Sequence, residues 1–217
     1  ENLVNHFSDV EIILLGSFVS VEALKNHPKV IKTYILNKKF DNLYKTLKVL
    51  GEFDLFFSFR GSFRSKFIKF CISSKNKYQF NSVKLNKLHQ VEKYNNFINN
   101  SLNIETIAKQ LTLHIKKKKK NKDGENKLLG INPGASYGSA KRWYPKHFAD
   151  VAIDLSSEYD IIIFGGPGEK DIAKDIENYL IKKGVDNYQN LSAKMNIKEL
   201  ITQISKLDLF VTGDSGP

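Results

Sequence analysis

The sequence predicts an α/β protein with two Rossmann-like domains, and three observations lead to this prediction. Short continuous apolar runs alternate with segments whose apolar residues recur at helical spacing. This alternation is typical of βαβ units, in which helices join successive parallel strands. A Lys-rich stretch without apolar residues interrupts the pattern, and the alternation resumes after it. At 217 residues, the chain is long enough for two small domains.

In the first half, three apolar runs predict buried parallel strands at residues 10–15, 30–36 and 54–59. Two segments between and after them predict amphipathic helices. The residues that share a helical face are Leu43, Leu47 and Leu50 in one segment, and Phe63, Phe67, Ile68 and Cys71 in the other. Cys71 is the single cysteine, so we expect it in the core and no disulfide within the chain.

The predicted boundary between the domains lies in the Lys-rich stretch, where residues 116–120 are all lysine. We expect a first domain at 1–115, a linker at 116–127 and a second domain at 128–217. A solvated connection explains the lysines, and a contact with nucleic acid or lipid is the alternative.

In the second half, strands are predicted at 128–132, 160–164 and 208–212, and a helix at 145–157. Two further helices follow from spacing, and Asn196 with Glu199 predicts a capping box at the start of the second one. Their apolar faces hold Ile172, Ala173, Ile176, Tyr179 and Leu180, and then Ile197, Leu200, Ile201 and Ile204.

The chain is strongly basic, with 34 lysines and arginines against 23 acidic residues and a net charge of +11. Such a charge attracts anionic partners, among which nucleic acid, lipid head groups and phosphorylated sugars all qualify. No apolar run approaches the roughly 18 residues that span a bilayer, and no signal-peptide pattern opens the chain. We therefore expect a cytoplasmic protein that touches a membrane surface without crossing it.

Three Gly-rich loops follow predicted strands of the second half, at 131–145, 165–169 and 213–217. Backbone N–H groups and the positive ends of the following helices would face a ligand there, which favours phosphate. Tight turns that need glycine are the alternative explanation for any single loop. Neither a Walker loop nor a Gly-x-Gly-x-x-Gly motif occurs, which argues against ATPases and dinucleotide enzymes.

The first of these loops carries the groups that a departing diphosphate needs. Ser136 and Ser139 can donate hydrogen bonds to phosphate oxygens, and Lys141 supplies positive charge. For the neighbouring Arg142 and Trp143, solvation and helix packing are the simpler explanations.

Together the three loops resemble glycosyltransferase family 9, the lipopolysaccharide core heptosyltransferases that use ADP-heptose, and within it the heptosyltransferase II branch. The resemblance is specific in residues 128–217. It implies a GT-B type fold, with two Rossmann-like domains facing a cleft. It also implies an inverting, metal-independent transfer of heptose from ADP-heptose to the inner-core heptose of lipopolysaccharide or lipooligosaccharide, without a cofactor.

The resemblance also assigns roles to individual residues. Lys141 would stabilise the leaving diphosphate, Gly165 and Glu169 would lie on the nucleoside side, and Glu169 would accept hydrogen bonds from ribose. Asn190 would lie near adenine. Asp214 would bind heptose hydroxyls, while Ser215 and Gly216 would donate to phosphate. From the residues alone, Glu169 equally suits a helix dipole, the Asn190 match is explained by loop structure, and Asp214 suits a turn.

For the acceptor, Arg60 and Arg64 follow a predicted strand and share one face if a helix starts there. With Lys93, four residues after His89, they would hold acidic sugars. Two solvated arginines and a structural histidine are the alternative.

Residues for a catalytic base and for a metal are not found by these patterns. The family's base is an aspartate of a Gly-Asp loop that precedes the region matched by Glu1, so we expect a longer protein and name no base in this chain. No His, Cys, Asp and Glu cluster has metal-ligand spacing, and we expect no structural metal.

The expected partners are ADP-heptose, an anionic lipid-linked core oligosaccharide and the inner-membrane surface, at which the protein would be peripheral. We expect no nucleic-acid partner. The alternatives are another core heptosyltransferase, I or III, and a non-enzymatic module that binds nucleic acid or anionic lipid.

Overall fold

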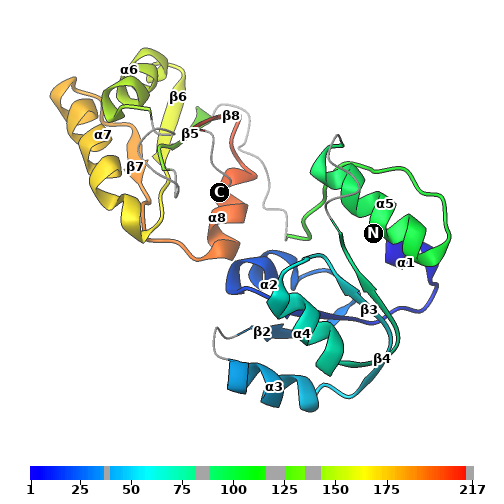
Figure 1. Cartoon of the computed structure of the whole chain (residues 1–217). Coiled ribbons are helices and arrows are strands. Elements are labelled where there is room, and N and C mark those ends of the chain that lie inside the picture. The colour runs from blue at the N-terminus through cyan, green and yellow to red at the C-terminus, as the bar shows by residue number, and fades with distance from the viewer. Residues whose placement is uncertain (37–39, 82–87, 116–125, 135–142, 214–217) are drawn as a thin grey trace. The chain divides into compact units, whose positions relative to one another are not determined.

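The computed structural model describes the chain except residues 37–39, 82–87, 116–125, 135–142 and 214–217. It divides the chain into two compact units, Glu1–His114 and Ile115–Pro217, and each unit contains both helices and strands (Figure 1). The predicted linker at 116–127 falls at the start of the second unit. Within the described residues, no helix is long and apolar enough to cross a membrane.

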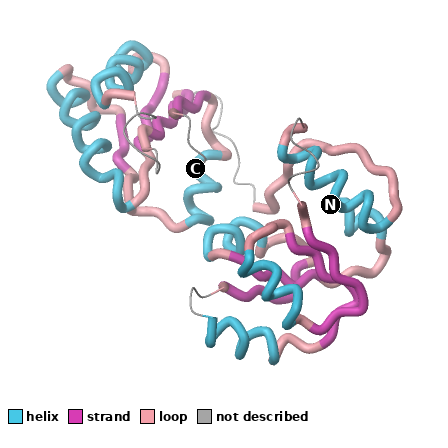
Figure 2. Tube along the Cα trace, viewed as in Figure 1, coloured by secondary structure: helices cyan, strands magenta, loops and turns pink. Residues whose placement is uncertain are grey.

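The first unit alternates helices and parallel strand pairs (Figure 2). Its elements are α1 (Asn2–His6), β1 (Ile12–Gly16), α2 (Phe18–Leu24), β2 (Val30–Ile35), α3 (Phe40–Lys48), β3 (Glu52–Ser58), α4 (Phe63–Cys71), β4 (Ser73–Gln79) and α5 (Gln90–Leu102). β1 pairs with β2 and β3 pairs with β4, both in parallel. The three strands predicted for this half are therefore confirmed, with ends shifted by one to three residues.

The core of the first unit forms where α3 and α4 pack against the strands. Leu43, Leu47 and Ile68 are buried there, and Cys71 packs against them as a free thiol. The prediction for Phe63 is wrong, because this first residue of α4 is 80% exposed. At a helix start, a side chain has no preceding turn to pack on, so helical spacing alone does not bury it.

The second unit is a single four-stranded parallel sheet. Its elements are β5 (Lys127–Asn132), α6 (Pro145–Leu155), β6 (Tyr159–Ile163), a short 3₁₀ turn η3 (Pro167–Glu169), α7 (Lys170–Lys182), β7 (Tyr188–Asn190), α8 (Ile197–Ile204) and β8 (Leu209–Thr212). The strand order is β7-β6-β5-β8. The chain thus moves outward from β5 to β7 and returns to the other side of β5, so the strand order reverses there.

The central strand β5 has two different faces. Leu129 and Ile131 are completely buried against the apolar sides of α6 and α7. On the opposite face, a Cβ atom at Gly130 would lie 2.3 Å from Leu207 Cδ1 and 2.9 Å from both Phe164 Cε2 and Phe210 Cδ2. Glycine at position 130 therefore allows the segment after α8 to pack directly on the sheet.

The predicted capping box at α8 is confirmed. Glu199 N donates to Asn196 Oδ1 at 3.0 Å, and Asn196 N donates to Glu199 Oε2 at 2.9 Å. Two of the otherwise unsatisfied N–H groups at this helix start are paired in this way.

We expect Gly130→Ala to lower the free energy of unfolding by about 1–3 kcal/mol, because the added methyl overpacks the sheet against Leu207, Phe164 and Phe210. Urea unfolding followed by circular dichroism measures this difference. Gly168→Ala is the matched control, since no atom lies within 4 Å of its added Cβ and the change should stay within about 0.5 kcal/mol. Equal stability of the two variants would contradict this account of Gly130.

Candidate functional site

The candidate site of the second unit lies where its parallel strands end. The loops that follow β5, β6, β7 and β8 leave the same edge of the sheet, because all the strand pairs are parallel. β5 and β8 are neighbours, and the strand order reverses between them. In open α/β sheets, ligands bind at the carboxyl ends of the strands beside such a reversal. Two of the predicted phosphate loops, after β5 and after β8, start at this point.

The ends of β5 and β8 are joined by a buried polar contact. Asn132 is 7% exposed, and its Nδ2 donates to Thr212 Oγ1 at 3.2 Å. Because an amide buried without a partner is unfavourable, this pairing favours one spacing between the two loops. Asn132 was not predicted as a site residue, although a polar residue that ends an apolar strand is a recognisable signal.

Glu169 connects the loops that follow β5 and β6. Its Oε2 accepts a hydrogen bond from Gly166 N at 2.6 Å, so the carboxylate pairs an N–H group at the start of η3. A Cβ atom on Gly134 would lie 1.8 Å from Glu169 Oε1. The carboxylate therefore occupies the space that any other side chain at position 134 would need. This geometry shows the helix-capping role for Glu169, and ribose binding stays a prediction.

Asn190 and Ser192 shape the loop after β7. Asn190 Oδ1 lies 2.7 Å from Ser192 Oγ and accepts from Ser192 N at 3.1 Å, while Asn190 Nδ2 donates to Glu177. Ala193 N donates to Gly165 O at 2.8 Å, which ties this loop to the predicted residue Gly165. The side chain of Asn190 thus organises a turn. Its predicted place near adenine stays a prediction.

The other predicted residues of the donor site lie outside the part of the chain that the structure describes. They are Ser136, Ser139, Lys141, Asp214, Ser215 and Gly216.

We expect Glu169→Ala to lower the free energy of unfolding by about 0.5–2 kcal/mol, because Gly166 N loses its acceptor at a helix start. Glu169→Gln keeps an acceptor oxygen and should lose less. Urea unfolding of both variants measures the two effects. An alanine variant as stable as the unsubstituted protein would show that this contact does not contribute.

In the first unit, the predicted acceptor residues flank the ends of β3 and β4. The backbone oxygen of Arg60 accepts from Gln79 Nε2 at 3.0 Å and lies 2.7 Å from Ser65 Oγ. The premise that Arg60 and Arg64 share a helix is wrong, because Ser62 caps the helix and α4 begins at Phe63. Arg60 is exposed in the loop before it, and Arg64 is partly buried in its first turn.

His89 has a structural role rather than a place in a basic wall. It is the N-cap of α5, where its Nδ1 accepts from Val91 N at 3.4 Å and its own N donates to Glu92 Oε2 at 3.2 Å. Lys93 lies partly buried in the following turn.

A shallow hollow of about 380 Å³ lies between β4 and α5. Aromatic, amide and hydroxyl side chains and a lysine line it: Lys77, Tyr78, Gln79, Phe80, Asn81, Phe97, Asn100 and Ser101. Neither β4 nor α5 was predicted, because their sequences are largely polar.

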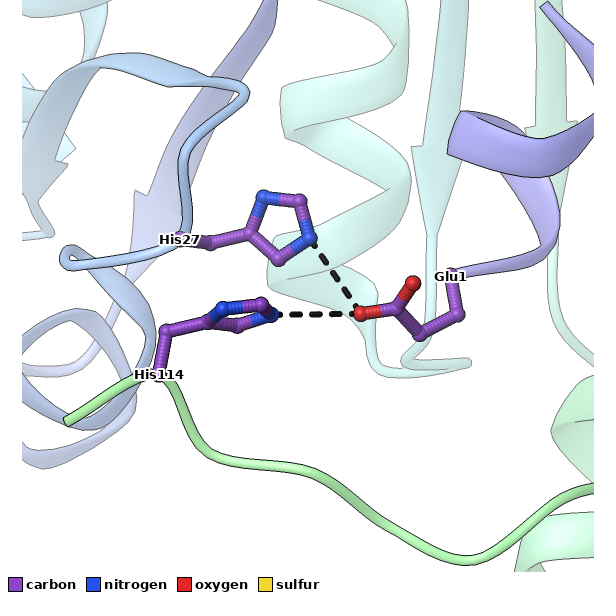
Figure 3. A group of neighbouring side chains, drawn as sticks. All are labelled: Glu1, His27 and His114. Atoms are coloured by element: carbon purple, nitrogen blue, oxygen red, sulfur yellow. Dashed lines mark hydrogen bonds and ion pairs between the residues drawn. The ribbon is translucent and has the colours of Figure 1, made fainter. Parts of the chain in front are cut away.

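One group of side chains in the described part of the chain has the donor types and spacing of a metal site. Glu1, His27 and His114 place their ligand atoms within 4.8 Å of one another (Figure 3). The hydrogen bond with His114 lowers the pKa of the Glu1 carboxyl below its ordinary value. Sequence spacing missed this group, since its members come from three distant segments.

These observations define an α/β protein whose second unit has the loop arrangement of a nucleotide-phosphate site, at a reversal of strand order. Residues 42–217 match the model of glycosyltransferase family 9 (heptosyltransferase). The chain is also 42% identical over 219 residues to lipooligosaccharide heptosyltransferase 2 of Campylobacter jejuni serotype O:2, which covers 98% of this chain and 68% of that protein. The chain therefore belongs to glycosyltransferase family 9, the heptosyltransferases.

Solved structures show the same fold. A glycosyltransferase of family 9 from Veillonella parvula has a TM-score of 0.79 at 17% identity, over 99% of this chain and 69% of that chain. Escherichia coli ADP-heptose LPS heptosyltransferase II has a TM-score of 0.76 at 18% identity, over 98% and 72%. The predicted α/β fold of GT-B type is confirmed, and the protein is a heptosyltransferase of lipopolysaccharide or lipooligosaccharide core biosynthesis. The alternative of a non-enzymatic binding module is thereby set aside.

Proposed function

We propose that this protein transfers heptose from ADP-heptose to the inner-core heptose of lipopolysaccharide or lipooligosaccharide, with inversion and without a metal. The observation that carries the proposal is the position of two loops at the strand-order reversal, after β5 and after β8. A nucleotide sugar has a diphosphate flanked by a nucleoside and a sugar, and such a ligand suits a crevice lined by several strand ends.

The chemistry needs compensation for the charge that develops on the leaving ADP. Lys141, with hydroxyl donors from Ser136 and Ser139, would supply it beside the N–H groups of the loop. The acceptor hydroxyl would attack the anomeric carbon from the opposite face while a base removes its proton, which inverts the centre. Because cationic and backbone donors supply the compensation, the proposal includes no metal and no cofactor.

The donor proposal draws on the relatives. The E. coli protein of the same fold is named for ADP-heptose. On this basis Asp214 would bind heptose hydroxyls, with Ser215 and Gly216 donating to phosphate. Glu169 would offer ribose the carboxylate capacity that remains after its bond to Gly166 N.

The acceptor would bind in the first unit. The carbonyl contacts of Arg60 hold the loop from which its exposed guanidinium extends, and Arg64 lies in the following helix turn. Lys93 is the third proposed cation. The hollow between β4 and α5 adds aromatic faces and amides, which are groups that suit a sugar.

The acceptor sugar and the cellular site follow from similarity and charge. Relatives named heptosyltransferase 2 favour that activity over heptosyltransferase I or III. A net charge of +11 favours peripheral attachment at an anionic inner-membrane surface, with the protein otherwise cytoplasmic. Nucleic acid has no part in the proposal.

We expect this chain to bind a non-transferable ADP-heptose analogue saturably at physiological salt, in preference to a UDP-sugar. Lys141→Ala should weaken that binding about 10- to 100-fold, the effect of losing a hydrogen bond from a charged group to phosphate. Isothermal titration calorimetry measures both results.

Lys146→Ala is the matched control, since Lys146 is an exposed lysine at the start of α6 in the same unit. Its affinity should equal that of the unsubstituted protein. Absence of binding by folded protein, or equal binding of ADP- and UDP-sugars, would count against the proposed donor.

We expect Arg60→Ala to raise the KM for the acceptor about two- to fivefold, as an exposed guanidinium screened by solvent would. The kcat and the KM for ADP-heptose should not change, because Arg60 would bind only the acceptor. Steady-state transfer assays that vary each substrate in turn separate these effects. Lys66→Ala, at an exposed position in α4, is the control. A changed donor KM would place Arg60 elsewhere in the mechanism.

A further inference from the structure

The group formed by Glu1, His27 and His114 joins three parts of the first unit (Figure 3). Glu1 precedes α1, His27 lies in the turn between α2 and β2, and His114 ends the segment that follows α5. His114 Nε2 lies 3.2 Å from Glu1 Oε1, and His27 Nε2 lies 3.4 Å from the same oxygen. Two imidazoles and one carboxylate therefore converge on one point.

The spacing suits a tetrahedral zinc ion. With Zn–N and Zn–O bonds of about 2.0–2.1 Å, adjacent ligand atoms of a tetrahedron are about 3.3 Å apart. The two distances to Glu1 have this length, and all three ligand atoms lie within 4.8 Å of one another. Two His nitrogens with one carboxylate oxygen are also a donor set that zinc accepts, with its fourth position open.

The backbone near each ligand is held independently of any ion. Asn2 Nδ2 donates to Asn95 Oδ1 at 2.7 Å and lies 2.8 Å from Thr106 Oγ1, which connects the residue after Glu1 to the segment that leads to His114. Val30 N donates to the backbone oxygen of His27 at 2.9 Å. These contacts bring the ligands close before a metal arrives, and pre-positioned ligands favour binding.

One hydrogen bond opposes zinc at His27. Lys29 N donates to His27 Nδ1 at 3.1 Å, so the neutral ring carries its proton on Nε2, the atom that faces Glu1. A metal at Nε2 requires the proton on Nδ1, where it would meet the Lys29 N–H group. Zinc binding therefore has to break this one hydrogen bond, and the amide of Lys29 reports it.

We propose that Glu1, His27 and His114 form a zinc-binding site that clips together the three segments of the first unit. The His27 side chain is 16% exposed and the His114 side chain 33%, while Glu1 is 48% exposed, so an ion can enter and a solvent molecule can complete its coordination. The role is structural, and the transfer reaction proposed above does not depend on it.

Zinc titration of the chelator-treated protein against a chromophoric chelator tests the proposal. We expect one zinc ion per chain, with affinity at least tenfold weaker in His27→Gln and in His114→Gln. His6→Gln is the control, because His6 is exposed at the end of α1 and does not belong to the group. Stoichiometric binding that survives in both folded variants, or no saturable binding, would overturn the proposal.

Two readings on the unsubstituted protein keep the test decisive if a variant does not fold. Cobalt(II) in place of zinc should give the intense visible absorption of four-coordinate cobalt, and zinc should shift the NMR signal of the Lys29 amide. A six-coordinate cobalt spectrum together with an unmoved Lys29 signal would show that the group is a hydrogen-bonded cluster only.

Discussion

The second unit depends on the burial of β5 between two layers. Leu129 and Ile131 fill one face against α6 and α7, and Gly130 leaves room for Leu207 and Phe210 on the other. Because β5 is covered on both faces, the chain can add β6 and β7 on one side and β8 on the other. The reversal of strand order, and with it the position of the phosphate loops, follows from this placement.

The loops at that edge depend on one another through polar contacts. Asn132 fixes the end of β5 to the end of β8, Glu169 occupies the space beside Gly134, and Ala193 is bonded to Gly165. Each contact links loops that follow different strands. A ligand at this edge would therefore meet a frame whose parts are already positioned, and less ordering would oppose its binding.

The sequence predicted most strands of both units, because each predicted strand is a continuous apolar run. It missed β4, whose residues 73–77 are polar and which is held by its ladder to β3. It assigned the capping box at α8 correctly because both partners are local. It missed Ser192, Asn132 and the group of Glu1, His27 and His114, since such contacts depend on tertiary packing that spacing does not encode.

Glu169 shows why a motif and a geometry carry different information. The family resemblance assigns this residue to ribose, and its carboxylate in the structure bonds to Gly166 N and lies against Gly134. The two roles are compatible, because a carboxylate has about four lone-pair sites and one donor occupies one of them. The cap would hold the carboxylate at the crevice edge before ribose arrives. A helix-start contact and a substrate contact can thus use the same side chain.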